Sequence, residues 1–294
     1  MPKIGLVLSG ALSKGAYQLG FLKALNEKIN TKHIKIIAGT SIGACNAYSF
    51  STNKLDVLEK LWLEFDISNA FKLWRKVVFK NTIRKHLNIL MTDGDEAKIP
   101  FYVTTLRVFP WWKFRYIRFE GNYQKHWLKM INGAVGFPII TGPATFHKFQ
   151  VYTDGGIVDN IPIRPLNGYD LDLIIVLHFD PKFKINYRAY GKTIVVDVDC
   201  SAGIIDGQRS FDFSNKNVSK MIDIGYNNGI KTIDRLVYQV ENGELLDEAK
   251  KIRKEQEKAR ENQRALDSWP TRLNRVFKKQ RDKLNIKSHI DDYQ

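Results

Sequence analysis

The sequence predicts a three-layer α/β/α protein with a central, mostly parallel β-sheet. Short apolar runs typical of buried strands alternate with segments whose apolar residues recur at helical spacing. The runs at residues 171–179 and 193–198 have no polar face, which is typical of central strands in a parallel sheet. The chain has 294 residues, 44% of them hydrophobic, which is enough for one large domain with an ordinary core.

The first 65 residues contain the clearest alternation. The apolar run at residues 3–9 predicts a strand, and the helical spacing that follows predicts a helix from Gly15 to Leu25. A second strand is predicted at residues 34–37. Helices are predicted next, over 44–50 and 54–65. This order of elements favours parallel pairing of the two strands.

The remaining elements are less regular. Beyond the strands at 171–179 and 193–198, we expect helices at 71–91, 124–132 and 214–238, and paired strands at 99–108 and 113–119. Ser214 is the expected N-cap of the last helix. After residue 240 the composition shifts towards Lys, Arg, Glu and Gln. We therefore predict a main domain at 1–240 and a basic helical appendage at 241–294.

The net charge of +15 predicts attraction to an anionic surface. Residues 250–290 contain fourteen Lys or Arg and five Asp or Glu. This appendage either lies on an anionic membrane or packs an apolar stripe of Trp269, Leu273 and Val276 against the main domain. We expect no nucleic-acid partner, because no known nucleic-acid-binding motif is present.

A second candidate for lipid contact is the turn Pro110-Trp111-Trp112. Tryptophan is typical of the lipid interface, and Lys113, Arg115 and Arg118 would supply cations for phosphate. The alternative is that both tryptophans are buried under a neighbouring helix, which is the more common arrangement for such large side chains.

Cysteine content and the N-terminal sequence suggest a cytoplasmic protein. Cys45 and Cys200 have no neighbours at metal-ligand or redox spacing, so we expect reduced cysteines, no metal and no cofactor. The first residues lack the pattern of a signal peptide, and no apolar stretch reaches about 18 residues. A peripheral membrane location remains compatible with the charge.

A candidate nucleophile occurs where the second predicted strand meets a helix. Ser41 lies there in the pattern Gly39-Thr40-Ser41-Ile42-Gly43. Glycines two residues before and after the serine permit a very sharp turn that presents the hydroxyl, and the helix that follows directs its N–H groups at charge forming nearby. These features favour an acyl-transfer nucleophile over a simple glycine-rich turn.

The base that activates this serine has two candidates. Ser41, Asp154 and His178 occur in the chain order of an α/β-hydrolase triad, but His178 lies at the end of a predicted buried strand, where a structural histidine is expected. Asp154 is followed by Gly155 and Gly156, which permit a tight turn and a close approach to another segment. An ordinary Asp-Gly-Gly turn is the alternative for this segment.

Taken together, these segments resemble the patatin-like phospholipases. The likeness rests on LSGALSKGAYQLGFLKAL at residues 8–25, GTSIG at 39–43, and DGG at 154–156 followed by Asn160-Ile161-Pro162. The segments at 133–143 and 212–229 are also similar, so the resemblance covers about residues 3–235. It implies a patatin-like fold and a Ser-Asp dyad without histidine, with Ser41 as nucleophile and Asp154 as general base.

The resemblance also implies an anion-binding loop at residues 10–15. In the family this loop is typically Gly-Gly-Gly-x-Arg/Lys-Gly, and its backbone N–H groups form the oxyanion hole. Gly10, Lys14 and Gly15 match this pattern, whereas Ala11 and Leu12 carry side chains in place of glycine. Because glycine adopts positive φ more freely than residues with a side chain, the oxyanion hole is expected to be reshaped.

We therefore predict a serine esterase that hydrolyses acyl ester bonds of membrane phospholipids through an acyl-enzyme. One alternative keeps the site but makes the protein a transacylase or a neutral-lipid lipase. Another is a non-catalytic module that binds lipid or protein on the same scaffold, which the departures at Ala11 and Leu12 motivate. The sequence does not predict the head group, the acyl position or the oligomeric state.

Overall fold

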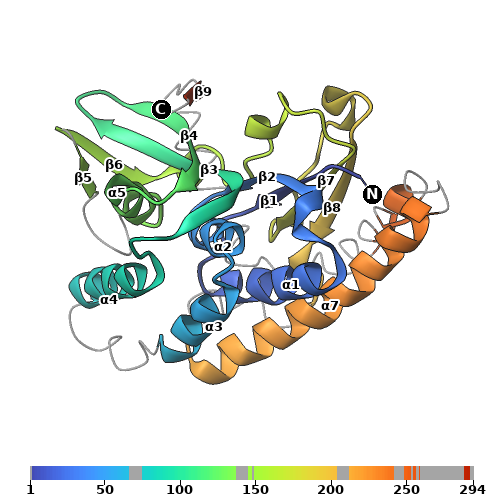
Figure 1. Ribbon diagram of the computed structural model, residues 1–294, viewed down its shortest axis with the longest axis horizontal. Coiled ribbons are helices and arrows are strands. Elements are labelled where there is room, and N and C mark those ends of the chain that lie inside the picture. Colours follow the sequence, from blue (N-terminus) through green and yellow to red (C-terminus); the bar gives the residue numbers. More distant parts are fainter. Residues whose placement is uncertain are drawn as a thin grey trace.

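The computed structural model describes residues 2–65, 75–136, 145–147, 149–203, 212–241, 248–252, 254–255, 258 and 288–291. Its centre is a mixed β-sheet with the strand order β5-β6-β3-β2-β1-β7-β8 (Figure 1). Strands β1, β2, β3, β7 and β8 run parallel to one another, while β6 and β4 pair with β3 in the antiparallel sense. The predicted, mostly parallel α/β class is confirmed.

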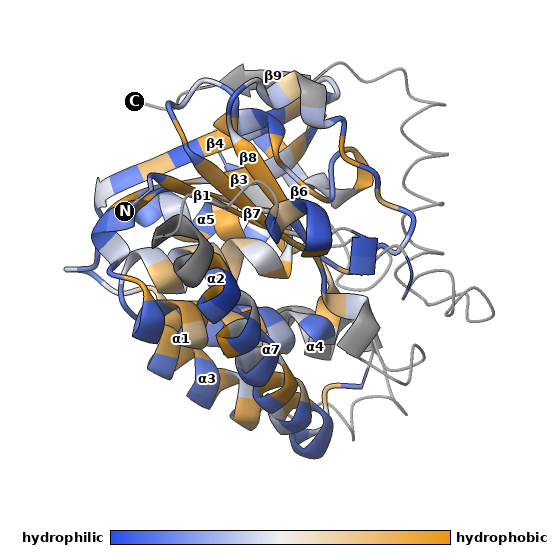
Figure 2. Ribbon diagram, turned by 90° about the vertical axis from the view of Figure 1, so that its right-hand side faces the viewer, coloured by the Kyte–Doolittle hydropathy of each residue, from blue (hydrophilic) through white to orange (hydrophobic). Residues whose placement is uncertain are grey.

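The strands have these bounds: β1 Ile4–Leu8, β2 Ile34–Gly39, β3 Glu96–Phe109, β4 Lys113–Asn122, β5 Thr145–His147, β6 Gln150–Asp154, β7 Leu173–His178, β8 Ile194–Asp199 and β9 Ser288–Asp291. All residues of β1 and β7 are buried, as their unbroken apolar runs predict. Figure 2 shows these central strands as a hydrophobic band between the covering layers.

One face of the sheet is covered by α-helices (Figure 1). They are α1 Gly15–Lys28, α2 Ile42–Ser51, α3 Leu55–Glu64, α4 Arg75–Leu90, α5 Lys125–Ala134 and α7 Asn215–Glu241. Side chains from α1, α2, α3, α5 and α7 join alternate residues of the strands in one large core cluster. The long helix α7 packs closely against α1, where a Cβ on Gly225 would lie 2.0 Å from the carbonyl oxygen of Tyr17.

The opposite face is covered by two segments, one between β6 and β7 and the other between β7 and β8. Within the described residues this layer consists of loops and short 3₁₀ turns, including Gly155–Ile157, Arg164–Leu166 and Tyr187–Tyr190. Their side chains pack with Val7, Ile36 and Val176 in a second, smaller core cluster. The third layer is therefore present, and in the described residues it is built from loops and tight turns.

Most predicted elements occur within a few residues of their expected bounds. The strands β5, β6 and β9 were not expected, and β9 pairs with β4 at the edge of the sheet. The predicted helix at 71–91 corresponds to α4, and its first four residues lie outside the described residues. No described helix has the length and hydrophobicity needed to cross a bilayer.

Much of the predicted C-terminal appendage, including Trp269, Leu273 and Val276, lies outside the described residues. In the part that is described, Ala249 and Ile252 are buried in the main core. Glu248 is also buried, and it forms a hydrogen bond of 2.6 Å with Arg235 of α7. This first part of the appendage therefore packs on the main domain. The division into domains at 1–240 and 241–294 stays a prediction.

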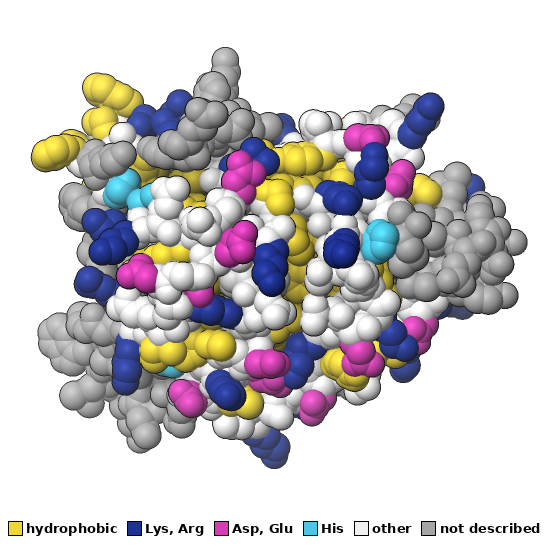
Figure 3. Space-filling model, in the orientation of Figure 1, with side chains coloured by type: hydrophobic (Ala, Val, Ile, Leu, Met, Phe, Trp, Pro, Cys, Tyr) yellow, Lys and Arg dark blue, Asp and Glu magenta, His cyan; other side chains and the backbone are white. Residues whose placement is uncertain are grey.

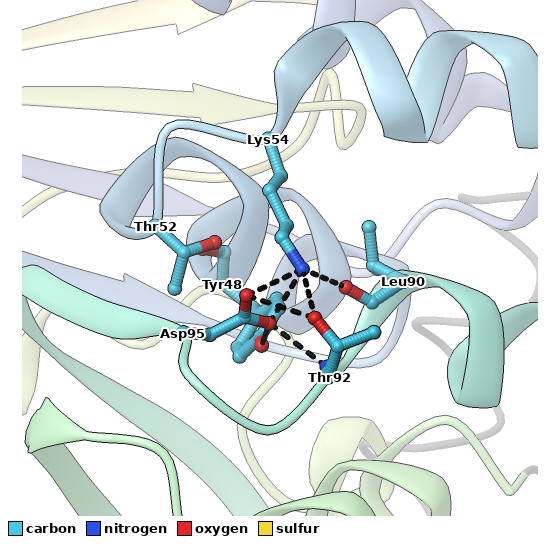
Figure 4. A network of polar contacts seen from close by, with 6 residues as sticks. All are labelled: Tyr48, Thr52, Lys54, Leu90, Thr92 and Asp95. Atoms are coloured by element: carbon cyan, nitrogen blue, oxygen red, sulfur yellow. Dashed lines mark hydrogen bonds and ion pairs between the residues drawn. The ribbon is translucent and has the colours of Figure 1, made fainter.

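A polar network joins the end of α4 to the start of β3 (Figure 4). Lys54 donates to Asp95 at 2.6 Å and to the carbonyl oxygen of Leu90 at 2.9 Å, and Tyr48 also donates to Asp95. Burial alone would raise the pKa of the Asp95 carboxyl, but hydrogen bonds from Lys54, Thr92 and Tyr48 outweigh it and lower this pKa. The network fixes the end of a helix that lines the cavity described below.

We expect Asp95→Asn to lower the free energy of unfolding by about 1–3 kcal/mol, because it removes a buried charge with several donors. Since the folded-state pKa of Asp95 is lowered, its contribution is present at neutral pH and is lost as the pH falls. Urea denaturation measures the effect. Asp170→Asn is the matched control, because the Asp170 side chain is 89% exposed in its ion pair with Lys3. Equal effects of the two substitutions would contradict the prediction.

Candidate active site

Ser41 occupies a sharp turn between the end of β2 and the start of α2. Its backbone has φ 55° and ψ −125°, a strained conformation for a residue with a side chain. Hydrogen bonds from Gly43 to Thr40 (2.8 Å) and from Ala44 to Ser41 (2.9 Å) hold the turn. A Cβ on Gly43 would lie 2.3 Å from the carbonyl oxygen of Leu8, and one on Gly39 would lie 2.4 Å from that of Gly43. Both glycines are therefore sterically required.

Asp154 is the last residue of β6, and sheet register brings it to Ser41. β3 lies between β2 and β6, with Val103 opposite Gly39 and Thr105 opposite Asp154. The Ser41 hydroxyl lies close enough to the Asp154 carboxyl to lower its pKa, against the effect of burial. The two residues that the sequence singled out therefore meet, although 112 residues lie between them in the chain.

The Asp154 carboxylate is buried, with 3% of the residue exposed. Burial raises the pKa of Asp154 to about 6, against the opposing effects of the nearby Ser41 hydroxyl and of the hydrogen bond from the Gly156 N–H. The Gly156 N–H donates to Oδ1 at 2.7 Å, which fixes the carboxylate in its turn. A Cβ on Gly155 would lie 2.7 Å from the backbone of Thr104, so this glycine permits the close approach to β3.

The loop at residues 10–15 passes beside Ser41. A Cβ on Gly10 would lie 3.0 Å from that of Ser41 and 2.4 Å from Oδ1 of Asn160. The Gly10 N–H donates to the Asn160 carbonyl (3.2 Å), and the Asn160 amide donates to the Gly10 carbonyl (3.0 Å). Leu12 has φ 54°, the left-handed conformation that a glycine adopts more easily. Within the described residues, the Ala11 and Leu12 N–H groups donate to no other residue.

Lys14 does not face the loop surface. It is 1% exposed, burial lowers the pKa of its ammonium to about 8, and the opposing electrostatic effect comes from Asp199. Gly15 begins α1, where a Cβ would lie 2.6 Å from the side chain of Ile42. These two residues of the expected anion-binding loop therefore anchor the start of α1 in the interior.

His178 is separate from this constellation. It is fully buried at the end of β7, where Nε2 is hydrogen-bonded to Asp197 and Nδ1 accepts from the Asp180 N–H at 3.1 Å. Both ring nitrogens are therefore engaged in the fold, as expected for a structural histidine. Cys45, one turn into α2, is also excluded as a nucleophile, because burial, together with Asp154, raises the pKa of its thiol to about 12.

Three polar residues near the site, Thr40, Thr104 and Asn160, were not predicted as site residues from the sequence. Thr104 donates to the Thr40 hydroxyl at 2.6 Å, and Thr40 donates to the carbonyl of Asp159 at 3.1 Å. Asn160 clamps Gly10 as described above. These bonds tie the segments that carry Ser41 and Asp154 to each other. The only sequence signal was the position of Asn160 after the aspartate motif, because threonine side chains in buried strands have no distinctive pattern.

An apolar cavity opens beside Ser41. Its walls come from the loop after β1, from α2, α3 and α4, and from Phe213 before α7, and they include Leu12, Leu58, Leu61, Trp62, Ile83 and Leu87. His86 is a polar exception, and its Nδ1 is 2.7 Å from the carbonyl of Thr82. Leu12 therefore contributes an apolar wall in place of the expected glycine. Among the described residues no group of three or more His, Cys, Asp and Glu side chains could hold a metal.

Comparisons with known proteins identify one matching family. A family model described as patatin-like phospholipase matches residues 6–167, which include the loop, Ser41 and Asp154. Among solved structures, the chain is similar to VipD from Legionella pneumophila, with 13% sequence identity, a TM-score of 0.40, and coverage of 79% of this chain and 67% of that one. No curated protein sequence matches the chain.

Proposed function

Because the chain belongs to the patatin-like phospholipase family of lipid acyl hydrolases, we propose that it is a serine esterase that cleaves acyl ester bonds of phospholipids. Ser41 is the nucleophile and Asp154 the general base. The observation that carries the proposal is the position of the buried Asp154 carboxyl, which sheet register brings beside Ser41, next to an apolar cavity. The cavity has the chemistry to hold an acyl chain.

The first half of the proposed reaction forms an acyl-enzyme. Asp154 takes the Ser41 proton while Oγ attacks the ester carbonyl carbon, and the carbonyl oxygen gains the negative charge. When this tetrahedral intermediate collapses, the bond to the alcohol breaks, and Asp154 returns the proton to the leaving alkoxide. A pKa of about 6 leaves Asp154 ionised at neutral pH, yet makes it a stronger base than an exposed aspartate.

The second half releases the fatty acid. Asp154 takes a proton from a water molecule, which attacks the acyl carbon, and the proton passes to Ser41 as the acyl bond breaks. The Ala11 and Leu12 N–H groups and the start of α2 are the proposed donors to the oxyanion. The Gly10 N–H is not proposed, because it is bonded to Asn160. Leu12 stands where the family's loop typically has glycine, but it still has a backbone N–H, so the difference removes no oxyanion donor.

The proposal places the protein in the cytoplasm with peripheral contact to anionic membranes, where its substrate is found. The net charge of +15 supports this contact. The direct test of the proposed function is digestion of a total lipid extract with wild type and Ser41→Ala, followed by mass spectrometry of the products. Free fatty acids and lysophospholipids that appear only with wild type support the proposal. Acyl groups transferred to another lipid would identify a transacylase, and no change in the extract would refute lipid hydrolysis.

The cavity predicts acyl-chain selectivity. We expect Ile83→Trp to lower kcat/KM for long-chain esters at least about tenfold relative to short-chain esters, because the larger side chain fills the wall of the cavity. Ile89→Trp is a matched control on the same helix, since Ile89 is 48% exposed. Kinetics with p-nitrophenyl esters of increasing length measure the ratio. If both variants keep the wild-type ratio, the cavity does not hold the acyl chain.

A further inference from the structure

Four aromatic side chains are exposed at two adjacent hairpin tips. Trp111 (71% exposed), Trp112 (53%) and Phe109 (56%) lie at the β3–β4 tip, and Phe149 (95%) lies at the β5–β6 tip. Figure 3 shows hydrophobic side chains standing out at this corner, with Lys and Arg side chains beside them. The alternative that Trp111 and Trp112 are buried under a helix is therefore wrong.

The two tips form one surface, which we call the aromatic tip and define as Phe109, Trp111, Trp112 and Phe149. Phe109 pairs with Val151, two residues from Phe149, in the register of β3 and β6. Arg107 bridges the hairpins, because it donates to the Trp111 carbonyl and to Gln150, both at 3.3 Å. The surface is thus held by sheet pairing and does not depend on a loose loop.

Phe149 has a strained backbone conformation, and its side chain makes no buried contacts that would offset the strain. Its φ is 59°, the left-handed region that favours glycine or asparagine, and a bulky residue there is strained. A buried side chain would offset this strain by packing, but Phe149 is almost fully exposed. A large apolar side chain that is strained and exposed is explained if it contacts something outside this chain.

The aromatic tip projects beyond the catalytic edge of the sheet. Val103 of β3 lies opposite Gly39, two residues before Ser41, and β3 continues for six more residues to Phe109. At about 3.3 Å per residue, the tip therefore extends roughly 20 Å past the level of Gly39, the last residue of β2. Because β2 and β3 run parallel, the tip lies beyond the same edge of the sheet as Ser41.

We propose that the aromatic tip inserts into the interface of an anionic phospholipid bilayer. Tryptophan and other aromatic rings favour the level of the lipid headgroups. The partly exposed side chains of Lys113 and Arg115 follow the tip in β4, and the chain has a net charge of +15, so charge complementarity also favours anionic headgroups. Within the described residues the tip is a projection formed by two hairpin ends, and the apolar cavity lies beside Ser41 instead, which favours a lipid surface over a protein partner. The inference rests on the proposed function, because it explains how Ser41 reaches a membrane substrate.

The test uses the full chain carrying Ser41→Ala, so that vesicles are not consumed. Co-sedimentation is measured with vesicles of phosphatidylcholine containing phosphatidylglycerol and with vesicles of phosphatidylcholine alone. We expect the triple substitution Trp111→Ala, Trp112→Ala and Phe149→Ala to weaken partition to the anionic vesicles at least about tenfold. Ile89→Ala, which removes an exposed hydrophobic side chain elsewhere, should keep partition within about twofold. Melting temperatures within a few degrees of the parent show that the variants are folded.

Unchanged partition of the folded triple variant would overturn the proposal. The proposal would also be overturned if sedimentation velocity shows that the triple substitution abolishes self-association while vesicle partition stays unchanged, because the aromatic tip would then be a contact between copies of this chain. If the triple variant does not fold, Trp111→Ser alone is measured, with a loss of at least about threefold expected and no loss overturning the proposal. In the Ser41 background, the triple variant should hydrolyse a soluble short-chain ester at the wild-type rate. If the wild type hydrolyses no ester but still binds vesicles, the proposed esterase function is refuted, while the proposal that the aromatic tip binds lipid is supported.

Discussion

Asp154→Asn is expected to lose activity by about 10³-fold or more while it unfolds at a higher temperature than wild type. The loss follows because the amide cannot accept the Ser41 proton, and general-base catalysis is worth about 10²–10⁴-fold. The higher unfolding temperature follows because the pKa of Asp154 differs between the folded and the unfolded protein. The pKa of Asp154 is raised from 3.8 to about 6 in the folded protein, so the stability that its protonation provides is present below pH 3.8 and is lost as the pH rises through 6.

At pH 8 the buried charge therefore opposes folding. A pKa difference of about two units corresponds to roughly 3 kcal/mol. This is the upper limit of the increase in unfolding free energy that Asp154→Asn can bring, because asparagine has the same shape but no charge. Ester hydrolysis and thermal unfolding of the same preparation measure both effects, with Asp170→Asn as an exposed control. Full activity of Asp154→Asn would contradict its role as base. Strong destabilisation would contradict the linkage argument.

The same pKa predicts the pH profile of the wild type. Since Asp154 must be ionised to act as base, kcat/KM should rise through pH 6 and level off above it, with about tenfold loss per unit at lower pH. A histidine base would give a similar profile, so His178→Asn distinguishes the two. This variant should lose stability, because His178 is buried against Asp197, but should keep turnover per folded molecule.

Gly43→Ala is expected to have the second-largest effect. The added methyl group would lie 2.3 Å from the carbonyl oxygen of Leu8 and 2.9 Å from that of Ser9, and neither backbone atom can move without displacing β1 or α2. We expect an unfolding free energy lower by about 3 kcal/mol or more, and esterase activity reduced at least about 100-fold in any folded fraction.

The control for this substitution is Gly168→Ala. A Cβ at Gly168 meets no atom within 4 Å, so this change should be nearly neutral. Urea denaturation and short-chain ester kinetics compare the two variants. If Gly43→Ala is as stable and active as Gly168→Ala, the close packing at the nucleophile turn is not required.

Much of the fold followed from short-range patterns. The unbroken apolar runs of β1 and β7 predicted buried parallel strands, and the glycines around Ser41 predicted its sharp turn. β5 and β6 were missed because β5 has only three residues and β6 leads directly into the Asp154 turn. β9 was missed because its pairing with β4 joins segments about 170 residues apart. Pairings of this kind leave no local signal.

The site was also only partly predictable. The joint pattern of motifs pointed to Ser41 and Asp154, but the sheet register that brings them together is a long-range property. The interior position of Lys14 was not expected, since a lysine in a polar loop normally faces solvent. The clamp between Asn160 and Gly10 depends on two segments that meet only after folding. The exposure of Trp111 and Trp112 could not be decided from residue type alone.

The central claim is that Ser41 is a nucleophile activated by Asp154, and a serine-reactive fluorophosphonate tests it most directly. Intact mass and peptide mapping should show one label on Ser41 of the wild type, no label on Ser41→Ala, and labelling of Asp154→Asn slowed by at least about 100-fold. No label on the wild type, a label on another residue, or equally fast labelling of Asp154→Asn would contradict the account.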